Sequence, residues 1–261
     1  MQVRGFVFDA EGQQLGNVHD VKLFCALYGY KLIMSMISDN LASVKAQIAA
    51  AEQEFGRLPQ TTRLLAVSKT FPELAVREAY AASQRCFGEN YIQEGVEKIL
   101  ALRDLPDLEW HMIGPIQSNK TRLVAEHFQW VHSVDRLKIA QRLSSLRPAH
   151  LPPLQVCLQV NIDGGANKSG CLPAEAFSLA LEIEKLPNLQ LRGIMVIPEP
   201  APDFVAACAE LSTARELFSS IKEHVIGFDT LSMGMSSDLR AAVKEGSTMV
   251  RVGTAIFGSR G

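Results

Sequence analysis

Lys69 ends an apolar segment, LLAVSK (64–69), and is the first residue whose type and place suggest chemistry. Apolar and small residues precede it, so we expect a strand buried on both faces with the lysine at its end. Lysine is rarely held there without a partner, and partial loss of water favours the neutral amine that attacks an aldehyde. The alternatives are a side chain that reaches from the rim into solvent, or one paired with Glu89.

The segment MVRVGTAIFG (249–258) places Arg251 inside an apolar strand pattern, followed by Gly253 and Thr254. A glycine at a strand end lets a ligand approach the backbone closely. Backbone N–H groups and the Thr254 hydroxyl could then hold phosphate oxygens. The alternative is that Arg251 belongs to a buried structural ion pair and that Gly253 forms a bulge.

The segment SMGMSSDL (232–239) offers a second place for an anion. Ser236 or Ser237 is expected to cap the next helix, with Asp238 in its first turn and facing away from any phosphate. Capping without a ligand is the alternative.

Two further segments carry polar residues where strands end, GENYIQE (88–94) with Asn90 and WHMIGPIQSNK (110–120) with His111. Ordinary helix capping explains either segment equally well, and a histidine in an apolar strand is more often a satisfied core residue. Lys168, in NIDGGANKSG, is expected to be solvated. The P-loop, the H-E-x-x-H metal motif and the G-x-S-x-G elbow are missing from the sequence.

Strand-like and helix-like segments alternate from residue 60 onward. The expected strands are 64–69, 85–90, 109–114, 130–135, 154–162, 191–197, 230–235 and 249–258, and the clearest helices are 72–83, 117–127, 136–146, 173–185, 203–223 and 237–245. This alternation predicts a single α/β domain, a (β/α)8 TIM-type barrel with an additional N-terminal helix. A doubly wound sheet is the rival, weakened by the lack of G-x-G-x-x-G after the first strand. Barrel chemistry sits at the carboxyl ends of the strands, where the residues above lie.

The first 35 residues differ from the rest. Residues 1–20 resemble a short hairpin, whereas Ile37, Leu41, Val44, Ile48 and Ala51 follow helical spacing from a start at Ser38 or Asp39. We therefore expect residues 1–35 to be an upstream extension from a misplaced start codon and residues 36–261 to form the barrel. A genuine appendage is the alternative. N-terminal sequencing of the native protein checks this, and a native peptide spanning Val3 to Met34 would contradict it.

Bulk properties exclude some classes of protein. A net charge of −2 argues against a nucleic-acid surface. The longest apolar stretch, Val21 to Ile37, is interrupted by lysines, which argues against a membrane span. Five scattered cysteines, without a C-x-x-C pair, fit a reducing cytoplasm better than a disulfide framework.

Seven ordered segments resemble the pyridoxal phosphate homeostasis protein family, whose barrel is of the alanine racemase N-terminal fold type. They are AVSKT, FGENYIQE, WHMIGPIQSNK, KSG, RGIMVIP, LSMGMSSDL and GSTMVRVGTAIFG, and the resemblance spans about Met36 to Gly261. It implies that Lys69 binds pyridoxal 5'-phosphate (PLP) as a Schiff base and that Arg251 donates to the pyridine nitrogen. It also implies that Ser236, Gly253 and Thr254 hold the phosphate, that Asn90 approaches the cofactor, and, more weakly, that His111 does.

The resemblance leaves two functions to weigh. Racemisation needs a second acid or base on the opposite face of the substrate, which alanine racemases take from a C-terminal domain. The sequence ends soon after the eighth strand and has four tyrosines, so we expect a carrier that buffers PLP or delivers it to apo-enzymes, without catalytic residues. We expect a monomer, or at most a weak dimer. The alternative is a PLP-dependent amino-acid racemase of low activity.

Overall fold

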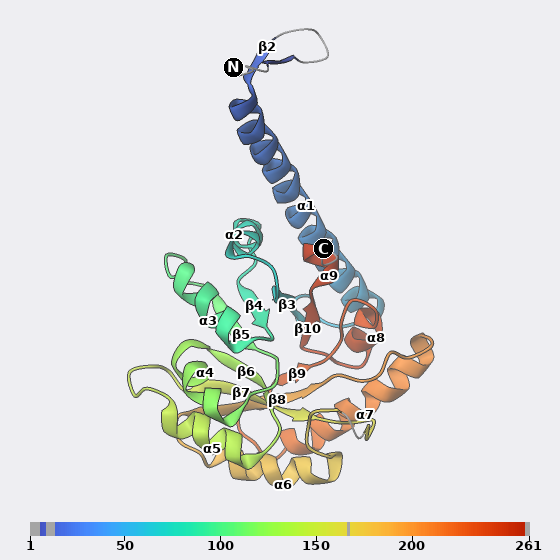
Figure 1. Ribbon diagram of the computed structural model, residues 1–261. Helices are drawn as coiled ribbons and strands as arrows, with labels where there is room; N and C mark the ends of the chain where they lie inside the picture. The colour runs from blue at the N-terminus through green and yellow to red at the C-terminus, as the bar shows by residue number, and fades with distance from the viewer. Residues whose placement is uncertain (1–5, 9–13, 166–167, 259–261) are drawn as a thin grey trace.

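Eight parallel strands close into a barrel in the computed structural model, which describes residues 6–8, 14–165 and 168–258 (Figure 1). The strands are β3 (Arg63–Val67), β4 (Cys86–Glu89), β5 (Glu109–Met112), β6 (Trp130–Val134), β7 (Leu154–Val160), β8 (Leu189–Val196), β9 (Thr230–Ser232) and β10 (Met249–Val252). They follow one another around the barrel, and β10 pairs with β3 to close it. The expected (β/α)8 barrel is confirmed, and the doubly wound sheet is excluded.

Helices cover the outside of the barrel (Figure 1). They are α2 (Glu73–Ala81), α3 (Ile92–Ala101), the short 3-10 turn η1 (Ser118–Lys120), α4 (Thr121–His127), α5 (Leu137–Leu146), α6 (Pro173–Glu184), α7 (Phe204–Lys222), α8 (Leu239–Lys244) and α9 (Thr254–Phe257). The expected final strand, 249–258, is too long. It ends at Val252, because Gly253 turns with helical backbone angles and Thr254 begins α9.

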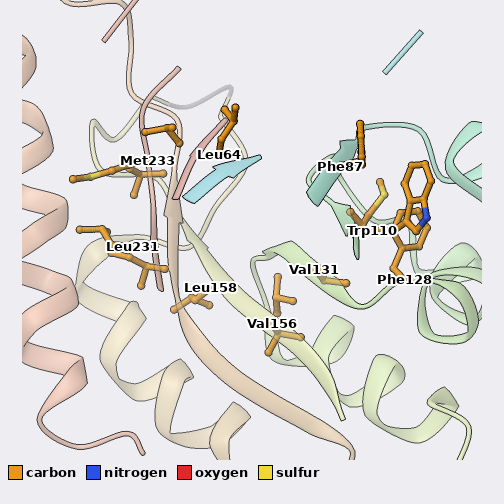
Figure 2. Packing of buried hydrophobic residues seen from close by; sticks show 14 of the residues in the cluster. Leu64, Phe87, Trp110, Phe128, Val131, Val156, Leu158, Leu231 and Met233 are labelled. Atoms are coloured by element: carbon orange, nitrogen blue, oxygen red, sulfur yellow. The ribbon is translucent and has the colours of Figure 1, made fainter. Parts of the chain in front are cut away.

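The main apolar core lies between the strands and these helices. Leu64, Val156 and Leu231 are among its buried members, and Figure 2 shows them with residues from neighbouring strands. Side chains alternate along a strand, so the neighbours of these residues face the barrel interior. Several inward positions are polar, notably His111, His132, Ser232 and Arg251, all buried. Barrel interiors are usually filled by branched apolar side chains, so this polar interior calls for a functional explanation.

The N-terminal helix α1 (Val18–Glu54) packs against α2, α8 and α9. The expected apolar stripe of Ile37, Leu41, Val44, Ile48 and Ala51 is confirmed as buried. The expected helix start at Ser38 or Asp39 is wrong, because residues 18–37 contain no proline and the helix continues through them. Beyond the barrel, α1 extends to an antiparallel pair, β1 (Phe6–Phe8) and β2 (Gln14–Asn17), which agrees with the expected hairpin (Figure 1).

Within the described residues, no helix combines the length and apolar character needed to cross a membrane.

Candidate functional site

The seam between β3 and β10 brings two of the expected site segments together. Val252 pairs with Ala66, so the residues after β10 continue beside the residues that lead to Lys69. A Cβ added at Gly253 would lie 3.1 Å from the Val67 carbonyl oxygen, which is tighter than most Cβ contacts, so the two backbones run close together. Lys69 is half-buried at this rim. Thr254, which follows Gly253 and begins α9, is exposed. The structure therefore places the lysine and the Gly-Thr turn at one edge of the barrel.

Arg251 lies below this edge with 5% of its surface exposed. Its Nη1 donates to the Ser232 carbonyl oxygen at 2.7 Å and to the Ser232 Oγ at 2.9 Å, and its Nη2 donates to the Val196 carbonyl oxygen at 2.8 Å. These acceptors are uncharged, so the alternative of a structural ion pair is not what holds Arg251 in place. Burial lowers the pKa of Arg251 to about 10, which still leaves it charged near neutral pH.

The loop between β9 and α8 carries Ser236, which is exposed at the same end of the barrel. Asp238 directly precedes α8, so the expected cap at Ser236 or Ser237 is wrong by one or two positions. The Asp238 Oδ1 accepts the Met235 N–H at 2.6 Å, so its carboxylate is turned onto the loop's own backbone. This leaves the exposed Ser236 and Ser237 hydroxyls as the polar side-chain groups that the loop offers.

A buried ion-pair cluster holds the backbone on both sides of Lys69. Ser68 donates its hydroxyl to Glu89 at 2.6 Å, and its carbonyl accepts from Lys98 Nζ at 2.7 Å. Lys98 also contacts Glu89 at 2.9 Å and Glu94 at 2.6 Å, and Glu94 accepts the Thr70 N–H. Thr70 has a φ of 67°, a left-handed conformation that a β-branched residue adopts only under constraint. The cluster thus fixes the turn that carries Lys69.

A cavity of about 200 Å³ opens at the carboxyl ends of β4, β5, β7 and β8. Asn90, Asn161 and Lys168 are among the residues that line it. The expected solvated position of Lys168 is wrong: only 22% of its side chain is exposed, and it pairs with Asp163 and with Glu199, the latter at 3.0 Å. The two carboxylates thus hold the Lys168 side chain at the wall of this cavity.

His111 lies deeper than the other expected residues and is fully buried. Its Nδ1 is 2.9 Å from His132 Nε2, and its Nε2 is 2.9 Å from the Glu109 carboxylate. Both ring nitrogens are therefore engaged by the protein, and His111 reaches the rim only through other residues.

The sequence alone did not single out Ser232, His132 or Lys98. A weak sequence signal for them exists, namely a polar residue at a position where the pattern predicts burial. His132 and Ser232 occupy inward positions of apolar strands, and Lys98 lies on the buried face of an amphipathic helix.

Cys86, Glu109 and His111 place three potential metal-ligand atoms within 4.8 Å of one another near the opposite end of the barrel. Arg63 Nη2 donates to Glu109 at 2.6 Å and to Cys86 Sγ at 2.8 Å. The guanidinium already supplies the positive charge that this cluster can accept, which opposes binding of a cation.

Comparison with known proteins identifies the family. Residues 40–261 match the alanine racemase N-terminal domain. The pyridoxal phosphate homeostasis protein of Pseudomonas aeruginosa is 61% identical over 227 residues, covering 87% of this chain and 97% of that protein. The protein of the same name from Escherichia coli K12 is 52% identical over 232 residues, with 87% and 98% covered.

Solved structures agree with this result. PipY of Synechococcus elongatus, solved with PLP bound, is 40% identical, with a TM-score of 0.75 over 85% of this chain and 100% of PipY. Alanine racemase of Corynebacterium glutamicum is 15% identical, with a TM-score of 0.64 over 87% of this chain and 62% of the racemase, and shows a likeness of fold alone. The chain thus belongs to the pyridoxal phosphate homeostasis protein family, built on the alanine racemase N-terminal domain fold.

Proposed function

We propose that this protein binds PLP through a Schiff-base linkage at Lys69 and takes part in PLP homeostasis, by buffering the cofactor or delivering it to apo-enzymes. The observation that carries the proposal is the seam of β3 and β10, which sets Lys69 beside the Gly253–Thr254 turn with Arg251 buried behind it. PipY, which shares the fold at 40% identity and was solved with PLP bound, supports it.

The residues at the rim suit the chemical groups of PLP. When bound, the cofactor supplies an aldehyde that condenses with amines and a ring that can withdraw electrons. The Lys69 amine would meet the aldehyde. The Gly253 and Thr254 backbone N–H groups, the Thr254 hydroxyl and the Ser236 hydroxyl would hold the phosphate. Asn90 lines the adjoining cavity and would contact the cofactor from the other side.

Two features of the protein support the binding of a polar ligand at this site. A guanidinium has five N–H donors, and within the described part of the chain Arg251 uses three of them. The Oδ1 of Asn161, on the cavity wall, is buried and lacks a hydrogen-bond partner among the described residues. Buried polar atoms are normally satisfied, so the Asn161 Oδ1 supports a polar ligand, and Arg251 retains N–H donors for one.

The charge of Arg251 decides which chemistry the site favours. An arginine that faces the pyridine nitrogen donates to it without giving up a proton, and the ring then remains a weak electron sink. The site therefore favours holding the cofactor over carbanion chemistry such as transamination. His111 would act on the ring only indirectly, because both its nitrogens are engaged by protein groups.

The direct test is to incubate the purified full-length protein with PLP, reduce it with borohydride and map the labelled peptide by mass spectrometry. We expect one stoichiometric label, on Lys69. The loaded, unreduced protein should then activate a defined PLP-dependent apo-enzyme faster than the free cofactor released from it can. Labelling spread over surface lysines would contradict the site, and transfer no faster than release would contradict delivery and leave buffering.

A racemase assay separates the carrier from the alternative enzyme. The Tyr80 hydroxyl donates to Asp107 at 2.6 Å, and Tyr91 is 54% exposed at the start of α3. Neither arrangement is that of a base held against a substrate. Conversion of L- to D-amino acids at an ordinary enzymatic rate by the PLP-loaded protein would contradict the carrier function.

The proposed compartment is the cytoplasm. The cysteines that the structure describes, Cys86, Cys157, Cys171 and Cys208, are free thiols, which suits a reducing compartment. We propose that the protein acts as a monomer, with PLP-dependent apo-enzymes as its transient partners.

A further inference from the structure

A continuous line of polar groups crosses the inside of the barrel from Arg251 to the opposite end. Ser232 Oγ, which accepts from Arg251, lies 2.9 Å from His132 Nδ1. The line continues from His132 to His111 and from His111 to Glu109, at 2.9 Å each, and ends at Arg63. Ser232, His132 and His111 are all 0% exposed, so these bonds exclude water and each donor must meet an acceptor.

The two ends of this line fix the position of every proton in it. Glu109 is ionised, because hydrogen bonds from His111 and Arg63 lower its pKa against the effect of burial, so it can only accept. His111 must then carry its proton on Nε2 and accept on Nδ1 if it is neutral. His132 likewise donates from Nε2 and accepts on Nδ1, and the Ser232 hydroxyl donates to it.

The opposite order of protons fails at one end. If the His132 Nδ1–H donated to Ser232, the His111 Nδ1–H would donate to His132, and a neutral His111 would present a bare Nε2 to the Glu109 carboxylate. That contact repels unless His111 takes a second proton. Burial lowers the pKa of His111, partly offset by Glu109. Burial, together with the positive charges of Arg251 and Arg63, also lowers the pKa of His132. The charged groups that face His111 and His132 are Glu109, Arg63 and Arg251, and all three belong to this line of hydrogen-bonded groups.

We propose that His132, His111 and Glu109 act as positioning residues that orient the Ser232 hydroxyl and, through it, the Arg251 guanidinium toward the cofactor ring. This inference rests on the proposed function for its ligand, since Arg251 is the group that would meet the ring nitrogen. The Ser232 hydroxyl cannot turn its proton toward Arg251, because His132 requires that proton. Arg251 Nη1 therefore keeps both of its hydrogens on Ser232. This fixes the orientation of the guanidinium and leaves its unused N–H groups available to the cofactor ring.

The arrangement of protons can be measured without cofactor. Nitrogen NMR of the apo-protein labelled with ¹⁵N-histidine should show His111 and His132 both neutral and both protonated on Nε2, from pH 6 to pH 8. Spectra of His111→Gln and His132→Asn assign the two signals. A neutral Nδ1–H form of either residue, or a doubly protonated ring near pH 7, would overturn the relay whether or not the protein binds PLP.

The effect on the ligand is read from the absorbance of the PLP-loaded protein as pH is varied. His132→Leu removes the acceptor for Ser232, and we expect it to move the midpoint of the spectral titration by about one pH unit, tenfold in a protonation constant. His132→Asn keeps an oxygen near the Nδ1 position, so the midpoint of its titration should lie close to the wild-type value. If His132→Leu does not fold, Ser232→Ala tests the same link.

The controls separate this inference from the function on which it rests. His150→Leu alters an exposed histidine and should leave the titration unchanged. An unchanged midpoint in both His132→Leu and Ser232→Ala, with PLP still fixed at Lys69, would overturn the positioning role alone. Failure of the wild-type protein to fix PLP at Lys69 would instead overturn the proposed function, and the NMR result would still decide the proton arrangement.

Discussion

Replacing Lys69 by alanine is expected to reduce the PLP that remains on the protein after gel filtration by at least about 100-fold, or about 2.7 kcal/mol. The lysine supplies the amine that would hold the aldehyde, whereas the rim groups around it hold the remainder of the molecule only by hydrogen bonds. The chromophore and the borohydride-stable label, followed by absorbance and peptide mass mapping, should be lost together.

Two matched variants test whether the effect is specific to the Lys69 amine. Lys69→Arg keeps the positive charge and the long side chain, but a guanidinium does not give up a proton to act as a nucleophile, so it should fail as alanine does. Lys168→Ala removes the lysine that lines the neighbouring cavity and should keep the label on Lys69. If Lys69→Ala takes up as much label as wild type, and Lys168 carries the label in both proteins, the principal attachment site is not Lys69.

The barrel could be predicted from sequence because alternation is a repeated signal. Each buried strand and each amphipathic helix has its own sequence pattern. An error in one of them, such as the overlong 249–258 segment, therefore does not change the predicted topology. The positions of Lys69, Arg251, Gly253 and Thr254 at strand ends could be predicted for the same reason. A residue's height in a parallel barrel follows directly from its place in its strand.

Pairings between distant strands could not be predicted in this way. Ser232 and His132 are 100 positions apart, and their hydrogen bond depends on which inward side chains meet across the barrel. Lys168 was misplaced because its partner Glu199 comes from another loop, 31 positions away by number. Local sequence patterns show on which face of its strand or helix a residue lies. Which charged residue it contacts there depends on the tertiary structure.

The second large effect is expected at Lys98, in the ion-pair cluster beneath Lys69. Lys98→Met should lower the free energy of unfolding by about 3–5 kcal/mol, because it leaves the carboxylate of Glu89 buried without a cation. Glu89 is 0% exposed, and its second oxygen already lacks a hydrogen-bond partner among the described residues, so the carboxylate has little else to stabilise it. Urea denaturation followed by circular dichroism measures the change. Arg122→Met, at an exposed i, i+4 pair, is the matched control and should cost less than about 0.5 kcal/mol.

The pH dependence of this loss tests its cause. Burial raises the pKa of Glu89 even though Lys98 opposes the shift, and removing Lys98 raises it further. A carboxyl whose pKa is raised by folding destabilises the protein as pH rises above the unfolded value of about 4.3. The difference between Lys98→Met and wild type should therefore be largest near pH 8 and shrink as the pH falls and Glu89 takes up a proton. The double variant Lys98→Met with Glu89→Gln should recover most of the loss at pH 8, because a neutral amide needs no cation. Equal losses at pH 8 and at lower pH, or no recovery in the double variant, would mean that Lys98 stabilises the turn by packing rather than by charge.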